Sequence, residues 1–435
     1  MPTVSLYTLG CKLNFAETST LGKEFRTRGF DIVGFGEPAD VCVINTCSVT
    51  ERAERQCRQV VRRALRTSSN PYVVVTGCYA QLRPDDVAGI AGVDLVLGAH
   101  EKFELFDHVG GLEKNLYPHV AVSDIRTVNS FGPALTSTGD RTRAYLKVQD
   151  GCDYNCSFCT IPHARGVSRS QNIDMCVRQA RSLVVDGFRE ITLTGVNVGD
   201  FGKKKGTSLL ALLEELVQVE GLERIRVSSI EPNLLSNELI DFVAEHEKTC
   251  RHFHVPLQSG SDDILRLMRR RYTSETYAKM IETIRRKIPA CGIGVDVIAG
   301  FPGESDRHFE ETCRFVESLP ISYLHAFTYS ERPDTPAASF SQTVEPKVRF
   351  RRSDVLRLLG DRKKRAFHHA MVGRTVDVLL EHDVAEGFRY GFTDNYVRVG
   401  VPIEGTDANT FVRATITGLG KDACRAGILV PEVRI

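Results

Sequence analysis

The chain has 435 residues, of which 42% are hydrophobic and 26% are charged, and its formal net charge is +1. This length accommodates two or three globular domains. The balanced charge argues against a protein that binds polyanions over its whole surface, although it permits a local basic patch. The sequence shows no secretory signal and no apolar stretch long enough to span a bilayer, so we expect a cytoplasmic protein that is not in a membrane.

The first three apolar strands each end at a cysteine. The runs SLYTLG, VCVINT and YVVVTG lead into the segments of Cys11, Cys47 and Cys78. In an open parallel sheet the carboxyl ends of the strands gather at one edge, so we expect the three thiols to meet there and to be able to hold a metal cluster. Ser48 and Glu51 offer a capping box for a following helix. The alternative is three unrelated buried thiols, because free cysteine is often a core residue.

A second group of cysteines lies in the segment GCDYNCSFCT, residues 151–160, as Cys152, Cys156 and Cys159. Its glycine and polar residues interrupt any apolar period and favour a loop after the strand AYLKV. Three thiolates can hold three irons of a cubane cluster and leave the fourth iron open, whereas a structural zinc site needs a fourth protein ligand. The alternatives are a zinc site with His163 as a distant ligand and a purely structural cluster.

The other seven cysteines have simpler interpretations, because in a reducing compartment disulfides are less expected than core packing or metal binding. Cys57, Cys176 and Cys313 recur with apolar residues at helical spacing, and Cys42 lies within an apolar strand. We expect these four in the core. The remaining three have no informative neighbours: Cys250, Cys291 and Cys424.

The middle of the chain alternates strand-like and helical patterns. The strand-like runs are AYLKV, EITLTG, RIRVSSI, HFHVPL, GIGVDVI and YLHAFTY. This alternation predicts a parallel sheet. Six such units would form an incomplete barrel, open to a macromolecule, with functional loops at the carboxyl ends of its strands. Gly195, Glu231 and Gln258 fall at such ends, where they suit close backbone approach or polar contacts to a ligand, although turn-forming or solvated roles are equally open.

The C-terminal third begins with a basic segment. Ten Lys or Arg residues stand against two Asp between residues 347 and 374. Arg362, Lys363, Lys364 and Arg365 suit contacts to RNA phosphates. The alternative is one solvated face of an amphipathic helix, whose buried stripe we expect to include three residues, Val355, Leu358 and Leu359.

Beyond it, the runs RTVDVLLEH, YVRVGVP and FVRATITGL are short alternating strands, as in a small all-β barrel. Such barrels often bind nucleic acid.

Together these motifs resemble the radical S-adenosylmethionine (SAM) methylthiotransferase family. LGCKLNFAETS, INTCSVTERAERQ and VVTGCYAQ are similar to its N-terminal cysteine segments, and the C-x3-C-x2-C loop with Phe158 before its last cysteine is similar to its radical SAM loop. The resemblance covers essentially the entire chain. It implies an α/β protein with an N-terminal open parallel sheet (1–130), a partial (β/α)6 radical SAM barrel (138–370) and a small all-β TRAM barrel (371–435).

The resemblance also implies the chemistry. Cys152, Cys156 and Cys159 would hold a 4Fe-4S cluster whose open iron binds SAM, and Cys11, Cys47 and Cys78 would hold a second 4Fe-4S cluster that carries sulfur. One SAM would methylate that sulfur, and another would yield the radical that removes hydrogen from the substrate. The implied SAM contacts are Phe158, Gly195, Glu231 and Gln258.

The implied substrate is tRNA. GCKLN and GFTDNYVRV favour the branch that acts on N6-threonylcarbamoyladenosine at position 37, beside the anticodon, with a low-potential electron donor and a sulfur donor as partners and a monomeric enzyme. The other branches act on N6-isopentenyladenosine in tRNA or on an aspartate of a ribosomal protein. A non-catalytic iron-sulfur or zinc RNA-binding protein is the alternative from another class.

Overall fold

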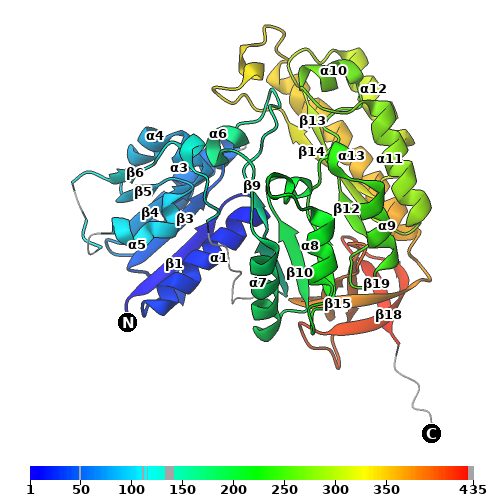
Figure 1. Cartoon of the computed structure of the whole chain (residues 1–435), viewed down its shortest axis with the longest axis horizontal. Coiled ribbons are helices and arrows are strands. Elements are labelled where there is room, and N and C mark those ends of the chain that lie inside the picture. The colour runs from blue at the N-terminus through cyan, green and yellow to red at the C-terminus, as the bar shows by residue number, and fades with distance from the viewer. Residues whose placement is uncertain (49, 110–111, 115, 133–141, 430–435) are drawn as a thin grey trace.

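The computed structural model describes residues 1–48, 50–109, 112–114, 116–132 and 142–429, and they form three parts in chain order. Figure 1 shows an N-terminal α/β sheet (blue to cyan), a central barrel of parallel strands (green to yellow) and a small β-barrel (orange to red). The expected start of the central domain at residue 138 lies outside the described residues. Within the described part of the chain, no helix is long and apolar enough to cross a membrane.

The N-terminal sheet has six parallel strands in the order β2-β1-β3-β4-β5-β6. The strands are β1 (Thr3–Thr8), β2 (Asp31–Val33), β3 (Val41–Thr46), β4 (Tyr72–Gly77), β5 (Leu95–Leu97) and β6 (His119–Ala121). The helices of this part are α1 (Lys12–Thr27), α2 (Glu51–Thr67), α3 (Cys78–Leu82), α4 (Pro84–Ala88) and α5 (Leu105–His108). Strand order reverses between β1 and β3, which leaves a crevice at their carboxyl ends where ligands bind in folds of this kind.

The central part confirms the predicted incomplete barrel. Two parallel three-stranded sheets, β11-β10-β7 and β12-β13-β14, are joined by the bridges Ile225 to Thr249 and Ser229 to His254. The strands are β7 (Arg143–Lys147), β10 (Glu190–Thr194), β11 (Arg224–Val227), β12 (His252–His254), β13 (Gly292–Ala299) and β14 (Tyr323–Thr328). The barrel is therefore open between β7 and β14. A short ribbon of β8 (Gln149–Asp150) and β9 (Arg169–Ser170) flanks β7.

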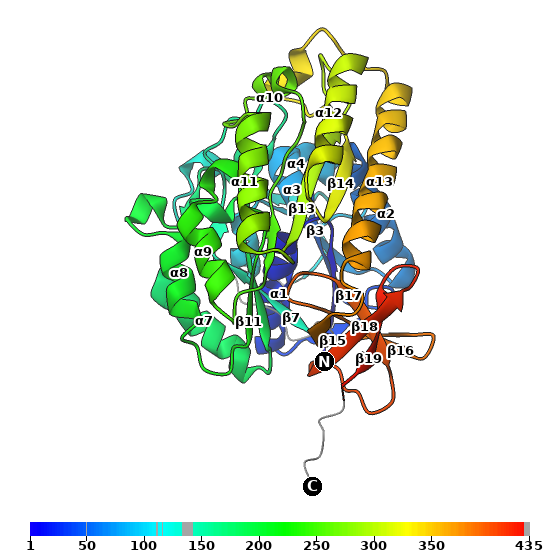
Figure 2. The ribbon, with the colours of Figure 1, turned by 90° about the vertical axis from the view of Figure 1, so that its right-hand side faces the viewer.

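Helices cover only the outside of this barrel, as Figure 2 shows for α11, α12 and α13. The helices of the central part are α6 (Ile161–Arg165), which lies beside α3 at the junction with the N-terminal part, and α7 (Ile173–Val185), α8 (Leu209–Leu216), α9 (Asn237–Glu245), α10 (Asp262–Leu267), α11 (Ser274–Lys287), α12 (Asp306–Ser318) and α13 (Pro346–His369). Alternate strand residues such as Leu146, Ile191 and Val295 pack into the apolar core beneath the helices. The positions between them face the lumen.

The lumen is polar, unlike the hydrocarbon-filled interior of a complete (β/α)8 barrel. In register, Arg143 of β7 lies opposite Glu190 of β10, and Asp296 of β13 lies opposite His325 of β14. The remaining lumen residues include His252, His254, Tyr323, Arg226 and Lys147. A polar, open-sided lumen suits a polar substrate.

The C-terminal barrel closes in the order β15-β16-β17-β19-β18. Its strands are β15 (Thr375–Ala385), β16 (Phe388–Phe392), β17 (Arg398–Pro402), β18 (Phe411–Leu419) and β19 (Cys424–Ile428). The sequence predicted β15, β17 and β18 and missed β16 and β19. The turn between β16 and β17 lies under the central barrel, where Arg226 donates to the carbonyls of Thr393 (3.1 Å) and Asp394 (2.9 Å).

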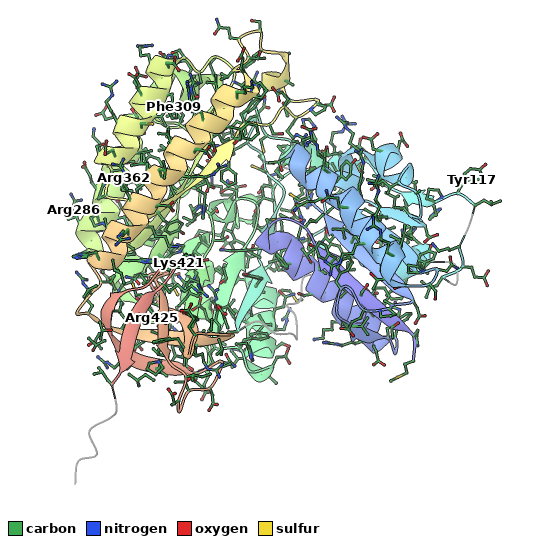
Figure 3. All side chains as sticks on the ribbon, turned by 180° about the vertical axis from the view of Figure 1, so that it is seen from behind. Tyr117, Arg286, Phe309, Arg362, Lys421 and Arg425 are labelled. Carbon is green, nitrogen blue, oxygen red and sulfur yellow. The ribbon has the colours of Figure 1, made fainter. Side chains whose placement is uncertain are left out.

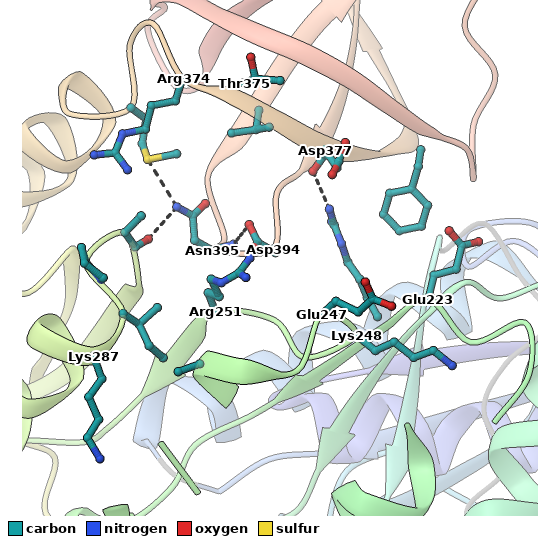
Figure 4. Close-up of a pocket in the computed structure, with 18 of the residues that line it drawn as sticks. Glu223, Glu247, Lys248, Arg251, Lys287, Arg374, Thr375, Asp377, Asp394 and Asn395 are labelled. Atoms are coloured by element: carbon teal, nitrogen blue, oxygen red, sulfur yellow. Dashed lines mark hydrogen bonds and ion pairs between the residues drawn. The ribbon is translucent and has the colours of Figure 1, made fainter. Parts of the chain in front are cut away.

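A cavity of about 780 Å³ runs along this junction (Figure 4). Lys248, Arg251 and Lys287 of the central barrel line one wall, and Asp377 and Asp394 of the C-terminal barrel line the other. It lies at the amino ends of the barrel strands, whereas functional loops of such barrels lie at the carboxyl ends. We therefore interpret it as a gap in the interdomain junction.

Two local predictions were wrong. Thr50, not Ser48, caps α2, since its side chain accepts from the amide of Ala53, while Ser48 is buried. On α13, Val355 and Leu358 are 43% and 66% exposed, so only Leu359 of the predicted stripe is buried. The helix packs against β14, and its buried face combines leucine with basic and small residues: Arg349, Arg352, Ser353, Leu356, Leu359 and Gly360.

The docking of the C-terminal barrel predicts a sensitive position at Gly292. A Cβ atom there would collide with the backbone carbonyl of Asn395. We expect Gly292→Ala to lower the free energy of unfolding by about 1 to 3 kcal/mol, as overpacking does. Gly427→Ala in β19 is the matched control, because a Cβ there meets no atom within 4 Å, and it should change stability by less than about 0.5 kcal/mol. Equal urea midpoints for the two variants would contradict this docking.

Candidate functional site

The structure brings the three N-terminal cysteines to one edge of the sheet. Cys11 follows β1, Cys47 follows β3, and Cys78 begins α3 directly after β4. A Cβ on Gly10 would lie 2.7 Å from the Cβ of Cys47, so the first two loops touch. The thiol of Cys11 in turn interacts electrostatically with Cys78.

Asn14 holds these loops together. Its side-chain amide donates to the carbonyls of Leu9 (2.8 Å) and Thr46 (3.0 Å), which lie at the ends of the first two strands. Gly77 turns the chain into Cys78 with φ +98°, and the backbone of Thr46 leaves no room for a side chain there. Sequence and backbone geometry together direct the three cysteines to one place.

The central cysteine loop is fixed at both ends. Cys152 donates its amide to Gly166 (3.0 Å), and Ser157 donates its amide to Met268 (3.1 Å). The sulfur of Cys156 accepts from the guanidinium of Arg270 at 3.1 Å, and the same guanidinium pairs with Glu231. Arg270 therefore couples the cysteine loop after β7 to the loop after β11.

These thiols do not ionise by themselves at neutral pH. Burial raises the pKa of Cys152 and of Cys159 to about 12. A bound metal removes such a proton because its charge stabilises the thiolate. The cysteine loop therefore suits a metal group that supplies positive charge.

A mononuclear zinc site is not supported here. Zinc thiolate bonds of about 2.3 Å would place the ligand sulfurs close together. Among the described residues, the one group of His, Cys, Asp or Glu side chains with ligand atoms within 4.8 Å of one another is His254, Asp296 and His325, which includes no cysteine. His163 is exposed on α6.

A cavity of about 200 Å³ opens beside the central loop. Its lining includes Cys159 and Phe158 and, from the N-terminal part, Thr50. The hydroxyls of Thr160 and Tyr329, which also line it, are buried and without a hydrogen-bond partner among the described residues. Because buried polar atoms are normally satisfied, these hydroxyls fit a polar organic ligand.

The four predicted SAM contacts differ in their surroundings. Phe158 and Gln258 line this cavity, and Gln258 has φ +67°, a left-handed conformation that is rare outside glycine. Glu231 is half-buried and pairs with Arg270. Gly195 packs against Gln149, where a Cβ would lie within 3.0 Å of its side chain and carbonyl, so a second protein segment requires this glycine.

Gln149, which was not predicted as a site residue from the sequence, connects two loops of the site. Its amide nitrogen donates to the carbonyl of Gly151 (2.7 Å), and its side-chain oxygen accepts from the amide of Asn197 (2.8 Å). It therefore ties the cysteine loop to the loop after β10.

A buried network of charges joins the N-terminal sheet to the central barrel. Glu17 of α1, which is fully buried, pairs with Lys102, with Lys147 of β7 (3.1 Å) and with both guanidinium nitrogens of Arg165 (2.9 and 3.1 Å). Arg165 also donates to Asp150 (3.0 Å). Burial by itself would raise the pKa of Glu17, but Arg165, Lys102 and Lys147 outweigh it and hold that pKa well below its usual range.

Arg165 connects this network to both cysteine groups. It lies on α6, six residues after Cys159, and its guanidinium donates to the side chain of Asn14 at 2.6 Å. It also interacts electrostatically with Cys11 and Cys78. Helix α3, which begins at Cys78, packs against α6.

A second set of contacts joins the same two parts through the loop after β14. Arg332 donates to the carbonyl of Ser48 (3.1 Å) and pairs with Glu54, and Arg83 pairs with Asp334 at 2.8 Å. The loop of Cys47 is therefore held against the loop after β14. The charged residues of both networks were not predicted from the sequence. Glu17 did carry a signal, because it recurs with Leu13 and Leu21 at the helical spacing of buried positions.

The basic segment lies on the last turns of α13. Arg362, Lys364 and Arg365 are exposed, and Figure 3 shows Arg362 at the outer surface. Lys363 lies on the opposite face, where its ammonium donates to the carbonyls of Glu317 (2.6 Å) and Leu319 (2.7 Å) at the end of α12. Lys363 is thus already engaged within the protein.

Comparison with known families agrees with this architecture. Residues 146–316 match the family model described as Radical SAM superfamily, and residues 3–98 match the one described as Uncharacterized protein family UPF0004. Among solved structures, the chain is similar to the radical S-adenosylmethionine methyltransferase TsrM from Kitasatospora setae, with a TM-score of 0.57 and 17% identity over 78% of this chain and 77% of that one. The central fold is that of a radical SAM enzyme.

Curated relatives cover nearly the whole chain. The Threonylcarbamoyladenosine tRNA methylthiotransferase MtaB of Bacillus subtilis is 38% identical over 92% of this chain and 90% of its own length, and that of Thermotoga maritima is 33% identical over 100% and 99%. The tRNA-2-methylthio-N(6)-dimethylallyladenosine synthase of Sphingopyxis alaskensis is 33% identical over 98% and 97%. The chain belongs to the tRNA methylthiotransferase family of radical SAM enzymes, a membership that implies the use of SAM and a 4Fe-4S cluster.

The buried network predicts that replacing its central acid, Glu17, strongly destabilises the protein. Glu17→Gln would leave the charges of Lys102, Lys147 and Arg165 undercompensated, and we expect it to lower the free energy of unfolding by about 3 to 5 kcal/mol. Glu24→Gln is the matched control on the same helix, since Glu24 pairs with the partly exposed Arg28 at 2.9 Å, and it should cost less than about 1 kcal/mol. Urea denaturation measures both, and similar losses would show that the network does not hold the two parts together.

Proposed function

We propose that this enzyme transfers a methylthio group to C2 of N6-threonylcarbamoyladenosine at position 37 of tRNA. The observation that carries the proposal is the meeting of two three-cysteine groups at one junction, beside a cavity lined by Cys159 from one loop and Thr50 from the other. Three ligands leave one iron of a cubane cluster without a protein ligand. The names of the relatives support the choice of substrate.

In this proposal two 4Fe-4S clusters are present. Cys152, Cys156 and Cys159 hold the cluster that binds SAM, and Cys11, Cys47 and Cys78 hold the other. When bound, these groups supply a carbon radical able to take hydrogen from an unactivated C–H bond and the sulfur that enters the product. The buried Ser48 hydroxyl and Asn45 side-chain oxygen near the second set are without partners among the described residues, which fits a group bound there.

The protein's own side chains position these groups. Arg270 orients Cys156 and Glu231 together, so the cysteine loop and the proposed SAM contact move as one unit. Phe158 packs edge-on against Phe301, with ring centres 6.4 Å apart, and shields one side of the cavity from water. Holding the reactants in place and excluding solvent is what such a cofactor requires of the protein.

The nucleoside has a route to this cavity through the open side of the barrel. On β14, His325 is exposed and Phe327, which lines the cavity, is 45% exposed. Aromatic side chains of this kind stack on bases that leave the RNA stack. The same route would admit N6-isopentenyladenosine, which is the second candidate substrate because relatives of both types match the chain.

The exposed face of α13 is the proposed contact to the tRNA backbone. Lys347, Arg351, Arg362 and Arg365 are exposed at spacings that share one face, over about 27 Å of helix. Phosphate contacts of this kind position RNA without reading its sequence. Lys363 is excluded from this face by its hydrogen bonds to α12.

The cluster assignment predicts iron contents and products. The reconstituted enzyme should hold about eight irons, and Ala variants of either three-cysteine group should hold about four. Loss of the N-terminal group should abolish the methylthio product and spare some reductive cleavage of SAM, with electrons from dithionite in place of the physiological donor. Cys57→Ala and Cys176→Ala, in the buried core, are controls that should change neither.

Nucleoside mass spectrometry of tRNA carrying threonylcarbamoyladenosine or isopentenyladenosine, incubated with enzyme, SAM and a sulfide source, decides the substrate. Saturation of the wild type at four irons would remove the second cluster. Product only from the isopentenyl tRNA would replace the proposed substrate.

The RNA contact predicts a salt effect. Arg362→Ala with Arg365→Ala should weaken tRNA binding at low salt and reduce the slope of log affinity against log salt by about 2. The variant makes two fewer phosphate contacts, so its binding releases fewer counterions. Lys279→Ala with Arg286→Ala, two exposed cations on α11, is the matched control and should match the wild type. Superimposable titrations for all three proteins would show that α13 does not contact the RNA.

A further inference from the structure

Lys12 is in an unusual position for a lysine. It directly follows Cys11 and occupies the first turn of α1, where no acidic residue accompanies it. A cation at a helix N-terminus faces the positive end of the helix dipole. Lys12 is also half-buried, and it makes no hydrogen bond or ion pair with any described residue. Fold stability does not explain this residue.

The ammonium of Lys12 belongs to the lumen of the central barrel. Helix α1 packs against β7, which borders the open side. The charge of Lys12 interacts with Arg143 of β7, Glu190 of β10 and Arg226 of β11. It also acts on two histidines, His252 of β12 and His325 of β14. Side chains from five strands of the barrel thus lie within electrostatic reach of it.

The neighbouring cations already have partners. Arg226 bonds Glu190 at 2.8 Å and two backbone carbonyls, and Arg143 pairs with Glu381 at 2.9 Å. Of these three cations, Lys12 is the one whose side chain has no hydrogen-bonded or ion-paired partner among the described residues, although Glu190 lies within electrostatic reach.

The pKa of Tyr396, on the turn between β16 and β17, reflects the electrostatic field of these cations. Burial would raise the pKa of this phenol, yet Lys12, Arg143 and Arg226 outweigh burial and lower it.

An anionic group of the substrate would complete this arrangement. The threonylcarbamoyl group ends in a carboxylate, whereas the dimethylallyl group is an uncharged hydrocarbon. A carboxylate would meet an unpaired ammonium inside a partly desolvated lumen, where charge-assisted hydrogen bonds are strong. A hydrocarbon there would leave the buried charge unpaired, which disfavours binding.

We propose that Lys12 binds the carboxylate of the N6 substituent and so selects threonylcarbamoyladenosine over bases with uncharged substituents. This inference rests on the proposed function and deepens it by naming the specificity residue. The N-terminal part, which would carry the second cluster, would thereby also contribute to the nucleoside pocket of the central barrel.

Variants at Lys12 test the inference. With an anticodon stem-loop that carries threonylcarbamoyladenosine, Lys12→Met should raise KM by about 10- to 100-fold, the range expected for a hydrogen bond to a charged group. Lys12→Arg should restore much of the affinity. Lys23→Met, an exposed lysine on the same helix, should behave as the wild type. Iron content and the cluster spectrum of Lys12→Met must match the wild type, which separates substrate binding from loss of the neighbouring cluster.

A change in the substrate completes the cycle. The same stem-loop with the carboxylate replaced by a carboxamide should bind the wild type as weakly as the natural stem-loop binds Lys12→Met, and the two changes together should add little. An unchanged KM for Lys12→Met, or fully additive losses, would overturn the role of Lys12 and leave the proposed function standing. Failure of the fully reconstituted wild type to modify the natural stem-loop would instead remove the proposed function.

Discussion

The arrangement of this enzyme depends on one buried acid. Glu17 gathers cations from three segments, among them the barrel strand β7 and the helix after the central cysteine loop. Burying so many charges is favourable only when the geometry satisfies nearly all of them. Such a network defines one relative placement of the two parts far more sharply than an apolar contact would, since a small displacement leaves charges unpaired. The relation between the two cysteine groups follows from that placement.

The junction between the parts is also where the chemistry would occur. Arg165 holds the start of α1, beside Cys11, against α6, and Arg332 holds the Cys47 loop against the loop after β14. Sulfur transfer between separately held groups requires reproducible spacing, because misplacement of reacting groups by a fraction of a bond length is costly. The charged contacts therefore serve catalysis through position, although none of them needs to touch the substrate.

Much of this fold was accessible from the sequence. The six barrel strands and the three strands that precede the N-terminal cysteines were predicted because apolar runs with regular spacing are strong signals. The strands β16 and β19 were missed because the segments FRYGF and CRAGI do not alternate regularly between apolar and polar residues. The cap of α2 was assigned to Ser48 instead of Thr50 because serine and threonine both favour the N-cap position, and the sequence does not show at which of them the helix begins.

The site was predictable in its cysteines and less so in its surroundings. Spacing after strands placed the six thiols, but Gln149, Arg165 and Arg270 act through partners far away in sequence, which no local pattern reveals. Gly195 is a case in which the sequence singled out a residue but for a different neighbour. Its position at a strand end suggested a ligand, whereas the neighbour that requires a glycine there is Gln149.

The turn under the central barrel has a consequence for how such enzymes can be recombined. Tyr396, held in a left-handed conformation at φ +68°, projects from the C-terminal barrel and stacks near His252 and Phe392 at the base of the lumen. The floor of the central chamber is thus supplied by a different domain. A chimera that exchanges the C-terminal barrel between family members would therefore alter the central chamber too, so this barrel cannot be exchanged as an independent module.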